Sequence, residues 1–289
     1  MTHVVRRAGE ADFTAVSPGV AAWTPVDETV PGAVHTEFGL CEIGPQAATS
    51  TRVQSFEEGF YILEGELALT TAAGTVLLRP GDYGMIPVGA AHTWHNPTAD
   101  QARFARMLAP QPRSRYARDT TTVADLPRRT PQPLDVRDPR NRDFGHIDPA
   151  HMDSDKQSQA LLAVSASMRT ALLVYSGITV KMMVDSDLGA TLTTMFMVQY
   201  APDGVAGTHD HPFEETYLFL EGRAEAVFDD QRYELGPGDV AFAGVGCVHG
   251  FRNLDSGPLR WLETQAPQPP SRHSYRFTRD WDYLRSSDG

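Results

Sequence analysis

Three histidines and one glutamate in the C-terminal half of the chain have the residue types and the spacing of a metal site. His209 and His211 are two positions apart, separated by one residue, and Glu215 and His249 follow them. Side chains two residues apart on a β-strand point to the same face, so the first two imidazoles should lie side by side. We expect all four groups to be metal ligands, and we expect Glu215 also to act in catalysis.

Three neutral imidazoles and one carboxylate form a mixed nitrogen–oxygen donor set. Such a set suits divalent first-row transition metals, among which we rank Fe2+, Mn2+ and Ni2+ ahead of Cu2+ and Zn2+. Four protein ligands on an octahedral ion would leave two positions for a small-molecule substrate or for substrate and dioxygen.

These four residues lie in the second copy of an internal repeat. Residues 32–112 align with residues 189–269 without a gap, at an offset of 157 that takes residue 32 to residue 189. At the positions of the four candidate ligands, the first copy has Arg52, Gln54, Glu58 and His92. Arginine has no lone pair to offer a metal, and its fixed positive charge opposes a nearby dication. The first copy therefore predicts a degenerate site, which either is structural, the interpretation that we favour, or uses Arg52 and His92 to hold a carboxylate.

The elements that must position these side chains have the pattern of short strands separated by glycine and proline, which is typical of antiparallel barrels and sandwiches. A hairpin is predicted around Asp229-Asp230, and Pro237-Gly238-Asp239 has the composition of a turn. We also expect a strand pair within residues 171–184. The strands predicted for the second copy are residues 191–200, 215–221, 224–229, 231–235, 240–243 and 259–264.

The repeat also divides the chain. We predict an N-terminal domain with the degenerate site over residues 1–112, a linker rich in proline, arginine and aspartate over residues 113–154, and a metal-binding domain over residues 155–289. Helix should be scarce, limited to short segments at residues 157–168 and 278–284.

The composition argues against several classes of function. A formal net charge of −12 and the lack of a basic stripe exclude nucleic acid as a partner, because phosphate binding needs clustered lysine and arginine. Two cysteines are too few for a disulfide framework, and no apolar run is long enough to span a membrane. The N-terminal residues carry charges and no apolar core region, so they do not look like a signal peptide. We expect a cytoplasmic protein with no membrane partner.

The spacing of the candidate ligands resembles the cupin superfamily. Its first motif is Gly, five residues, His-x-His, three or four residues, Glu, six residues, Gly. This chain matches it at His209, His211, Glu215 and Gly222, whereas Gly204 is one residue nearer than the motif requires. Its second motif is Gly, five residues, Pro-x-Gly, two residues, His, three residues, Asn. The second copy matches it at Gly238, Gly246, His249 and Asn253, with Gly244 in place of the proline; the first copy matches throughout, at Gly81, Pro87, Gly89, His92 and Asn96.

Two such copies make the chain similar to a bicupin. The resemblance implies an all-β protein of two tandem cupin barrels, each a double-stranded β-helix or jelly roll, with the metal near one barrel mouth and a homodimer as the assembly. Metal-dependent dioxygenases of the quercetinase type are the leading implied activity, on a small enolisable or aromatic substrate chelated to the metal. Tyr217 and Phe219 should face the same side as Glu215, and the Tyr217 hydroxyl is a candidate for orienting the substrate.

Two alternatives stay open. One is a non-redox bicupin, a hydrolase, decarboxylase or isomerase similar in layout to (S)-ureidoglycine aminohydrolase. That family has the ligand order Glu-x-His, three residues, His, whereas this chain has His-x-His, three residues, Glu. The other alternative is a binding protein without turnover.

Overall fold

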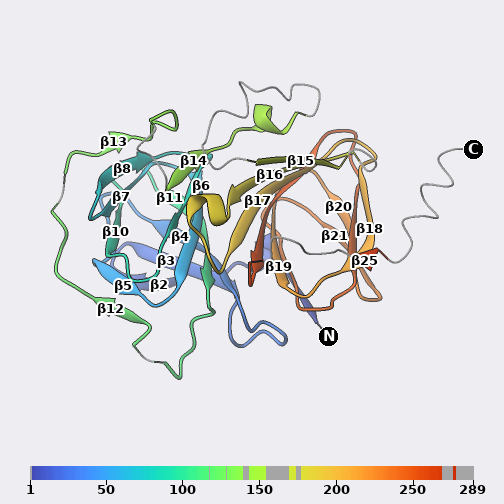
Figure 1. Cartoon of the computed structure of the whole chain (residues 1–289), viewed down its shortest axis with the longest axis horizontal. Coiled ribbons are helices and arrows are strands. Elements are labelled where there is room, and N and C mark those ends of the chain that lie inside the picture. Colours follow the sequence, from blue (N-terminus) through green and yellow to red (C-terminus); the bar gives the residue numbers. More distant parts are fainter. Residues whose placement is uncertain are drawn as a thin grey trace, which may run out of the picture.

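Two β-barrels lie side by side in the computed structural model of the chain (Figure 1), the first coloured blue to green and the second yellow to red. The structure describes residues 2–116, 118–127, 129–138, 143–153, 169–173, 177–268 and 276–277. Within these ranges helix is limited to three short 3-10 turns, so the prediction of an all-β protein is confirmed. The helices predicted at residues 157–168 and 278–284 lie outside the described residues. No described helix is long and apolar enough to cross a membrane.

The first barrel is built from two facing sheets. One sheet has the strand order β14-β9-β6-β11-β4-β3-β2, and the other has the order β12-β5-β10-β7-β8-β13. The elements of this half of the chain are η1 (Ala8–Glu10), β2 (Thr14–Ser17), β3 (Val20–Val26), β4 (Glu37–Ile43), β5 (Arg52–Gln54), β6 (Glu57–Glu64), β7 (Leu67–Thr71), β8 (Gly74–Leu78), β9 (Asp82–Ile86), β10 (His92–His95), β11 (Ala102–Ala109), β12 (Thr120–Thr122), β13 (Gln132–Pro133), β14 (Phe144–His146) and η2 (Pro149–Met152).

The second barrel repeats this plan with the orders β1-β22-β19-β24-β17-β16-β15 and β21-β20-β23-β18-β25. Its elements are β1 (His3–Arg6), β15 (Arg169–Leu173), β16 (Ile178–Val184), η5 (Ser186–Leu188), β17 (Thr194–Tyr200), β18 (Val205–Asp210), β19 (Glu214–Glu221), β20 (Ala224–Phe228), β21 (Gln231–Leu235), β22 (Val240–Ala243), β23 (His249–Asn253), β24 (Leu259–Ala266) and β25 (Arg276–Phe277). The predicted strand pair within residues 171–184 is confirmed as β15 and β16, and the predicted hairpin as β20 and β21.

Two turn glycines of the repeat have positive φ angles, which glycine adopts readily because it has no Cβ atom. Gly81 and Gly238, in the two Pro-Gly-Asp turns, have φ angles of 93° and 86°. These angles lie in the left-handed region, where a Cβ atom would be strained. The aspartate that follows each glycine then anchors a neighbouring strand: Asp82 bonds His146 of β14 at 2.7 Å, and Asp239 bonds Arg7 beyond β1 at 2.9 Å.

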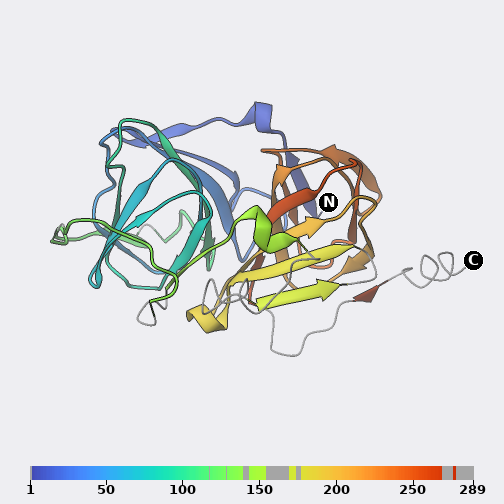
Figure 2. The same ribbon diagram turned by 90° about the horizontal axis from the view of Figure 1, so that it is seen from above.

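Strand pairing crosses the domain limits expected from the sequence. β1 pairs with β22 of the second barrel, although residues 1–112 were expected to form the first domain (Figure 2). Residues 113–154, expected to be a linker, provide β12, β13 and β14, which pair with strands of the first barrel. Each barrel thus receives an edge strand from the segment that precedes the other barrel. The physical reason is that β9 and β22 would otherwise expose an unpaired edge.

Among the residues that the structure describes, apolar packing forms three separate clusters. One fills the second barrel around Phe251 and Trp261, and one fills the first barrel around Trp94. The third lies between the barrels and joins residues of both halves, such as Met107 and Met195. The interface is therefore a hydrophobic core in its own right.

A reciprocal pair of buried carboxylates crosses this interface. Glu57 at the start of β6 accepts backbone N–H bonds from residues 191–193, at 2.7, 3.0 and 3.2 Å. Its repeat counterpart, Glu214 at the start of β19, accepts backbone N–H bonds from residues 34–36, at 2.7, 3.0 and 3.1 Å. Both carboxylates are almost fully buried, so the three N–H groups on each side replace the water that each carboxylate loses.

Replacing Glu57 with glutamine should lower the free energy of unfolding by about 1.5–3 kcal/mol, the contribution of hydrogen bonds to a charged acceptor. The amide keeps the shape of the side chain but turns an NH2 group toward N–H donors. Urea denaturation measures the effect, and Glu66→Gln, at an exposed position of the same barrel, is the control, with a change within about 0.5 kcal/mol. Equal effects of both substitutions would contradict the role given to Glu57.

Candidate metal centre

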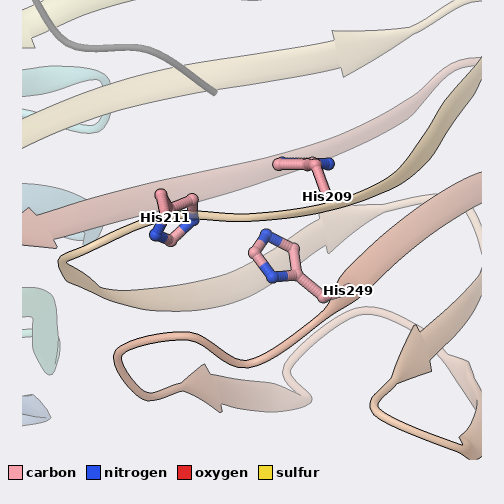
Figure 3. A group of neighbouring side chains, drawn as sticks. All are labelled: His209, His211 and His249. Carbon is pink, nitrogen blue, oxygen red and sulfur yellow. The ribbon is translucent and has the colours of Figure 1, made fainter. Parts of the chain in front are cut away.

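The four side chains singled out in the sequence converge inside the second barrel. His209 lies in β18, His211 directly follows that strand, Glu215 is the second residue of β19, and His249 begins β23. β18 and β23 are neighbours in one sheet, where His209 pairs with His249, so the sheet register itself brings two of the rings together. Figure 3 shows the three rings gathered within a small space. One nitrogen from each of the three rings lies within 4.8 Å of the others, a grouping that could hold a metal ion.

Each of the three imidazoles is fixed through the same ring atom. The Nδ1 atom of His209 bonds the carbonyl of Gly207 at 2.9 Å, that of His211 bonds Phe213 O at 3.0 Å, and that of His249 bonds Cys247 O at 2.9 Å. A carbonyl only accepts, so Nδ1 carries a proton in all three rings, and Nε2 is the ring atom left to bind a metal once it is deprotonated. Ligating histidines have this arrangement, in which a backbone oxygen fixes the tautomer and the orientation of the ring. The donor set therefore fits a metal ion.

The carboxylate of Glu215 completes the cluster. Its Oε2 atom lies 2.7 Å from His211 Nε2 and 3.3 Å from His249 Nε2, and it also accepts the hydroxyl of Tyr217. Its Oε1 atom accepts the amide of Gln265. Burial opposes ionisation, but the two imidazoles hold the pKa of Glu215 well below its usual range. Burial also lowers the pKa of His209 to about 4, so this ring is neutral near pH 7 and able to bind a metal.

The sequence-based expectation for the neighbouring aromatic residues agrees with the structure in part. Tyr217 and Phe219 lie on the inner face of β19, as predicted, and both are buried. The Tyr217 hydroxyl, for which a role in orienting a substrate stays a prediction, donates to Glu215 and so positions a candidate ligand. Phe213 packs flat against the His211 ring, at 4.0 Å between centroids and an interplanar angle of 7°.

Two polar residues of β24 were missed at the sequence level. Gln265 lies opposite Glu215 and Glu263 lies opposite Tyr217 in the pairing of β24 with β19. Trp261 Nε1 donates to Glu263 at 2.8 Å, and burial together with the nearby Glu215 raises the pKa of Glu263 well above its usual range. The available signal was the alternation of Trp261, Glu263 and Gln265 along the strand, which places three residues with polar groups on one face.

In the corresponding cluster of the first barrel, an arginine contacts the histidine and the glutamate. Arg52 pairs with His92 in the sheet, as His209 pairs with His249, and its Nε atom donates to His92 Nε2 at 3.3 Å. A second guanidinium nitrogen lies 3.7 Å from Glu58. With its amide oriented to satisfy both neighbours, Gln54 donates to Glu58 at 3.0 Å and accepts from Arg52 at 3.2 Å. The guanidinium thus supplies the positive charge at the position where the second barrel has a histidine, in agreement with the structural interpretation of this site.

A family model for the cupin domain matches the chain twice, over residues 39–108 and 196–264. The two stretches contain the two clusters just described. None of the curated proteins matches the chain in sequence.

Several solved structures are similar in fold. The crystal structure of a putative glyoxylate induced protein from Pseudomonas aeruginosa has 18% identity, a TM-score of 0.66 and coverage of 96% of this chain and 92% of that one. The formate complex of an oxalate decarboxylase from Lactobacillus farciminis has 15% identity, a TM-score of 0.65 and coverage of 98% and 92%. AerE from Microcystis aeruginosa has 12% identity, a TM-score of 0.58 and coverage of 89% and 96%. At these identities the likeness establishes a shared fold alone.

Replacing His211 with alanine should weaken Mn2+ binding at this centre by more than roughly 10- to 100-fold. That range is the usual effect of removing a hydrogen-bond partner of a ligand, and here the ligand itself is removed. Mn2+ is the suitable probe because it prefers nitrogen and oxygen donors to sulfur. Electron paramagnetic resonance of free Mn2+ measures the affinity. Gln54→Ala, at the repeat counterpart of His211, is the matched control, and the prediction fails if both variants bind Mn2+ as the unmodified chain does.

The first barrel should gain a metal site when Arg52 and Gln54 are both replaced by histidine. Glu58 is already in place, and His92 bonds Ala90 O through Nδ1 at 3.0 Å, which leaves its Nε2 atom for a metal once the arginine is gone. We expect one additional Mn2+ per chain, measured by elemental analysis after desalting. If the double variant folds and its metal content is unchanged, the residue types at these two positions do not explain why only the second barrel would bind a metal.

Proposed function

The chain is a bicupin, with two cupin domains in one polypeptide, and we propose that it is a metal-dependent enzyme whose reaction takes place in the second barrel. The observation that carries this proposal is the common orientation of three imidazoles, each with Nδ1 bonded to a backbone carbonyl and with one nitrogen within 4.8 Å of those of the other two rings. We assign His209, His211, Glu215 and His249 as the ligands. When bound, a first-row metal ion would supply Lewis acidity and a template for the substrate.

We propose a dioxygenase reaction on a small enolisable or aromatic substrate as the first candidate. The aromatic rings around the cluster, among them Phe213, Tyr217 and Trp261, would exclude water and pack against a flat substrate. Glu215 would accept the proton of the substrate hydroxyl, which is the work of a positioned general base. The hydrogen bonds from Tyr217 and Gln265 would hold this carboxylate in one orientation during the transfer.

A second candidate is decarboxylation of a small carboxylic acid without net oxidation. It is favoured by the second carboxyl group, Glu263, which is buried beside Glu215 and tied to Trp261. A carbanion left by loss of CO2 must be protonated, and a neighbouring carboxylic acid is suited to that step. The oxalate decarboxylases from two bacteria share the fold of this chain.

Glu215→Gln should lower kcat/KM by roughly 10²- to 10⁴-fold, the usual contribution of a general base. The assay is oxygen consumption by the full chain loaded separately with Fe2+, Mn2+, Ni2+ or Cu2+, against a flavonol, a β-diketone and a catechol. Glu58→Gln, at the repeat counterpart of Glu215, is the matched control and should leave the rate unchanged.

The same metal-loaded samples, incubated with small carboxylic acids under strict exclusion of oxygen, separate the two candidates. Release of CO2 without oxygen uptake selects the decarboxylase. The proposal of an enzyme is overturned if the unmodified chain binds the metal, His209→Ala does not, and neither assay shows turnover of these substrates. That outcome would favour a binding protein.

A further inference from the structure

A second group of metal-binding residues lies outside the centre described above. The ring of His3, the carboxylate of Asp229 and the thiol of Cys247 each have a donor atom within 4.8 Å of the others. His3 begins β1, Asp229 follows β20 in the hairpin turn, and Cys247 lies in the loop before β23. His3 and Cys247 are buried, whereas the Asp229 side chain is 37% exposed. An ion could therefore enter from the side of Asp229.

Hydrogen bonding fixes the tautomer of His3. The Tyr233 hydroxyl donates to Gln231 Oε1 at 2.5 Å, so its oxygen accepts from His3 Nε2 at 3.0 Å. The ring proton is then on Nε2, and the Nδ1 lone pair faces Asp229 Oδ2 at 3.3 Å. Thr2 Oγ1 donates to the same oxygen at 3.0 Å. Two electron-rich atoms face each other across the His3–Asp229 gap, a geometry that favours a cation between them.

The distance favours a metal ion over a second ring proton. Charge-assisted N–H···O bonds are about 2.7–2.9 Å long, shorter than the 3.3 Å observed here. With Zn–N and Zn–O bonds of about 2.0–2.2 Å, two ligands of a tetrahedral Zn2+ ion are separated by roughly 3.3–3.5 Å. The sulfur of Cys247 lies within reach as a third donor.

We propose that His3, Asp229 and Cys247 bind a tetrahedral divalent metal ion of the Zn2+ class, distinct from the ion assigned to His209, His211, Glu215 and His249. Nitrogen, oxygen and sulfur donors with one further position for water form a set suited to this ion. Binding replaces the S–H bond of Cys247 by a bond from sulfur to the metal, and the proton goes to solvent. No electron is transferred.

The site belongs to the second barrel alone. At the offset of 157, Asp229 corresponds to Ala72 and Cys247 to Ala90, so the first copy lacks two of the three donors. The ion would clamp β1 onto the barrel next to the backbone bond from Gly244 N to Thr2 O. It would also hold the loop whose Cys247 carbonyl bonds the His249 ring.

Cobalt substitution tests the proposal, because a thiolate bound to Co2+ gives a charge-transfer band in the near ultraviolet and His209, His211, Glu215 and His249 provide no sulfur. The full chain is stripped with a chelator and titrated with Co2+ without oxygen. We expect the band in the unmodified chain, its loss in Cys247→Ser and in His3→Gln, and its retention in Cys41→Ser and Asp230→Asn. His209→Ala should keep the band while losing the other ion, so this test does not depend on the proposed enzyme.

Tyr233→Phe keeps all three donors and removes only the group that holds the His3 tautomer. It should weaken Co2+ binding at this site by roughly 10- to 100-fold, as loss of a ligand's hydrogen-bond partner does. A merely structural role of Tyr233 would change the melting temperature and not this affinity. The proposal is overturned if the unmodified chain gives no sulfur-to-cobalt band, or if the band disappears in Cys41→Ser and persists in Cys247→Ser.

Discussion

The arrangement of the molecule depends on two adjacent glutamates at the start of one strand in each barrel. In β6 and β19 the first glutamate points outward and the second inward, because neighbouring side chains on a strand face opposite sides. The outward carboxylates, Glu57 and Glu214, are buried against backbone N–H groups of the opposite barrel. The inward carboxylates, Glu58 and Glu215, reach the two clusters. A one-residue shift of either strand would exchange the two roles, so the same register that joins the barrels also positions the candidate ligand.

A buried inward carboxylate in each barrel also needs a positive charge. Ionised carboxylates are costly in an apolar interior unless they are paired and hydrogen-bonded. The first barrel meets this need with the guanidinium of Arg52, which cannot be removed or exchanged. The second barrel meets it with three imidazoles, whose charge depends on protons or on a bound ion. The two copies therefore share a fold and differ in the source of the positive charge that balances the buried carboxylate. In the first copy it is an arginine side chain, and in the second it is protons or a bound ion.

Much of this could be predicted from the sequence because the repeat aligns without gaps. The offset of 157 identified the two copies and the one with three histidines, and the spacing of His209 and His211 predicted their shared location. The strand β23, which begins with His249, was not among the predicted strands. The edge strands β1 and β14 could not be predicted, because they pair with strands far away in the sequence. The residue pattern of a short strand does not indicate which strand it pairs with. For the same reason Gln265 went unnoticed: its contact with Glu215 exists only through the pairing of β24 with β19.

The exchange of edge strands has a consequence for the chemistry of the second barrel. Because β1 lies along β22, the first residues of the chain lie next to the loop that leads into His249. The His249 ring is oriented by the carbonyl of Cys247, and the thiol of that same residue lies within 4.8 Å of donor atoms of His3 and Asp229. The orientation of one candidate ligand therefore depends on a segment that the repeat does not contain. The first barrel lacks the thiol, since Ala90 stands in place of Cys247, and its His92 ring is held both by the Ala90 carbonyl and by Arg52.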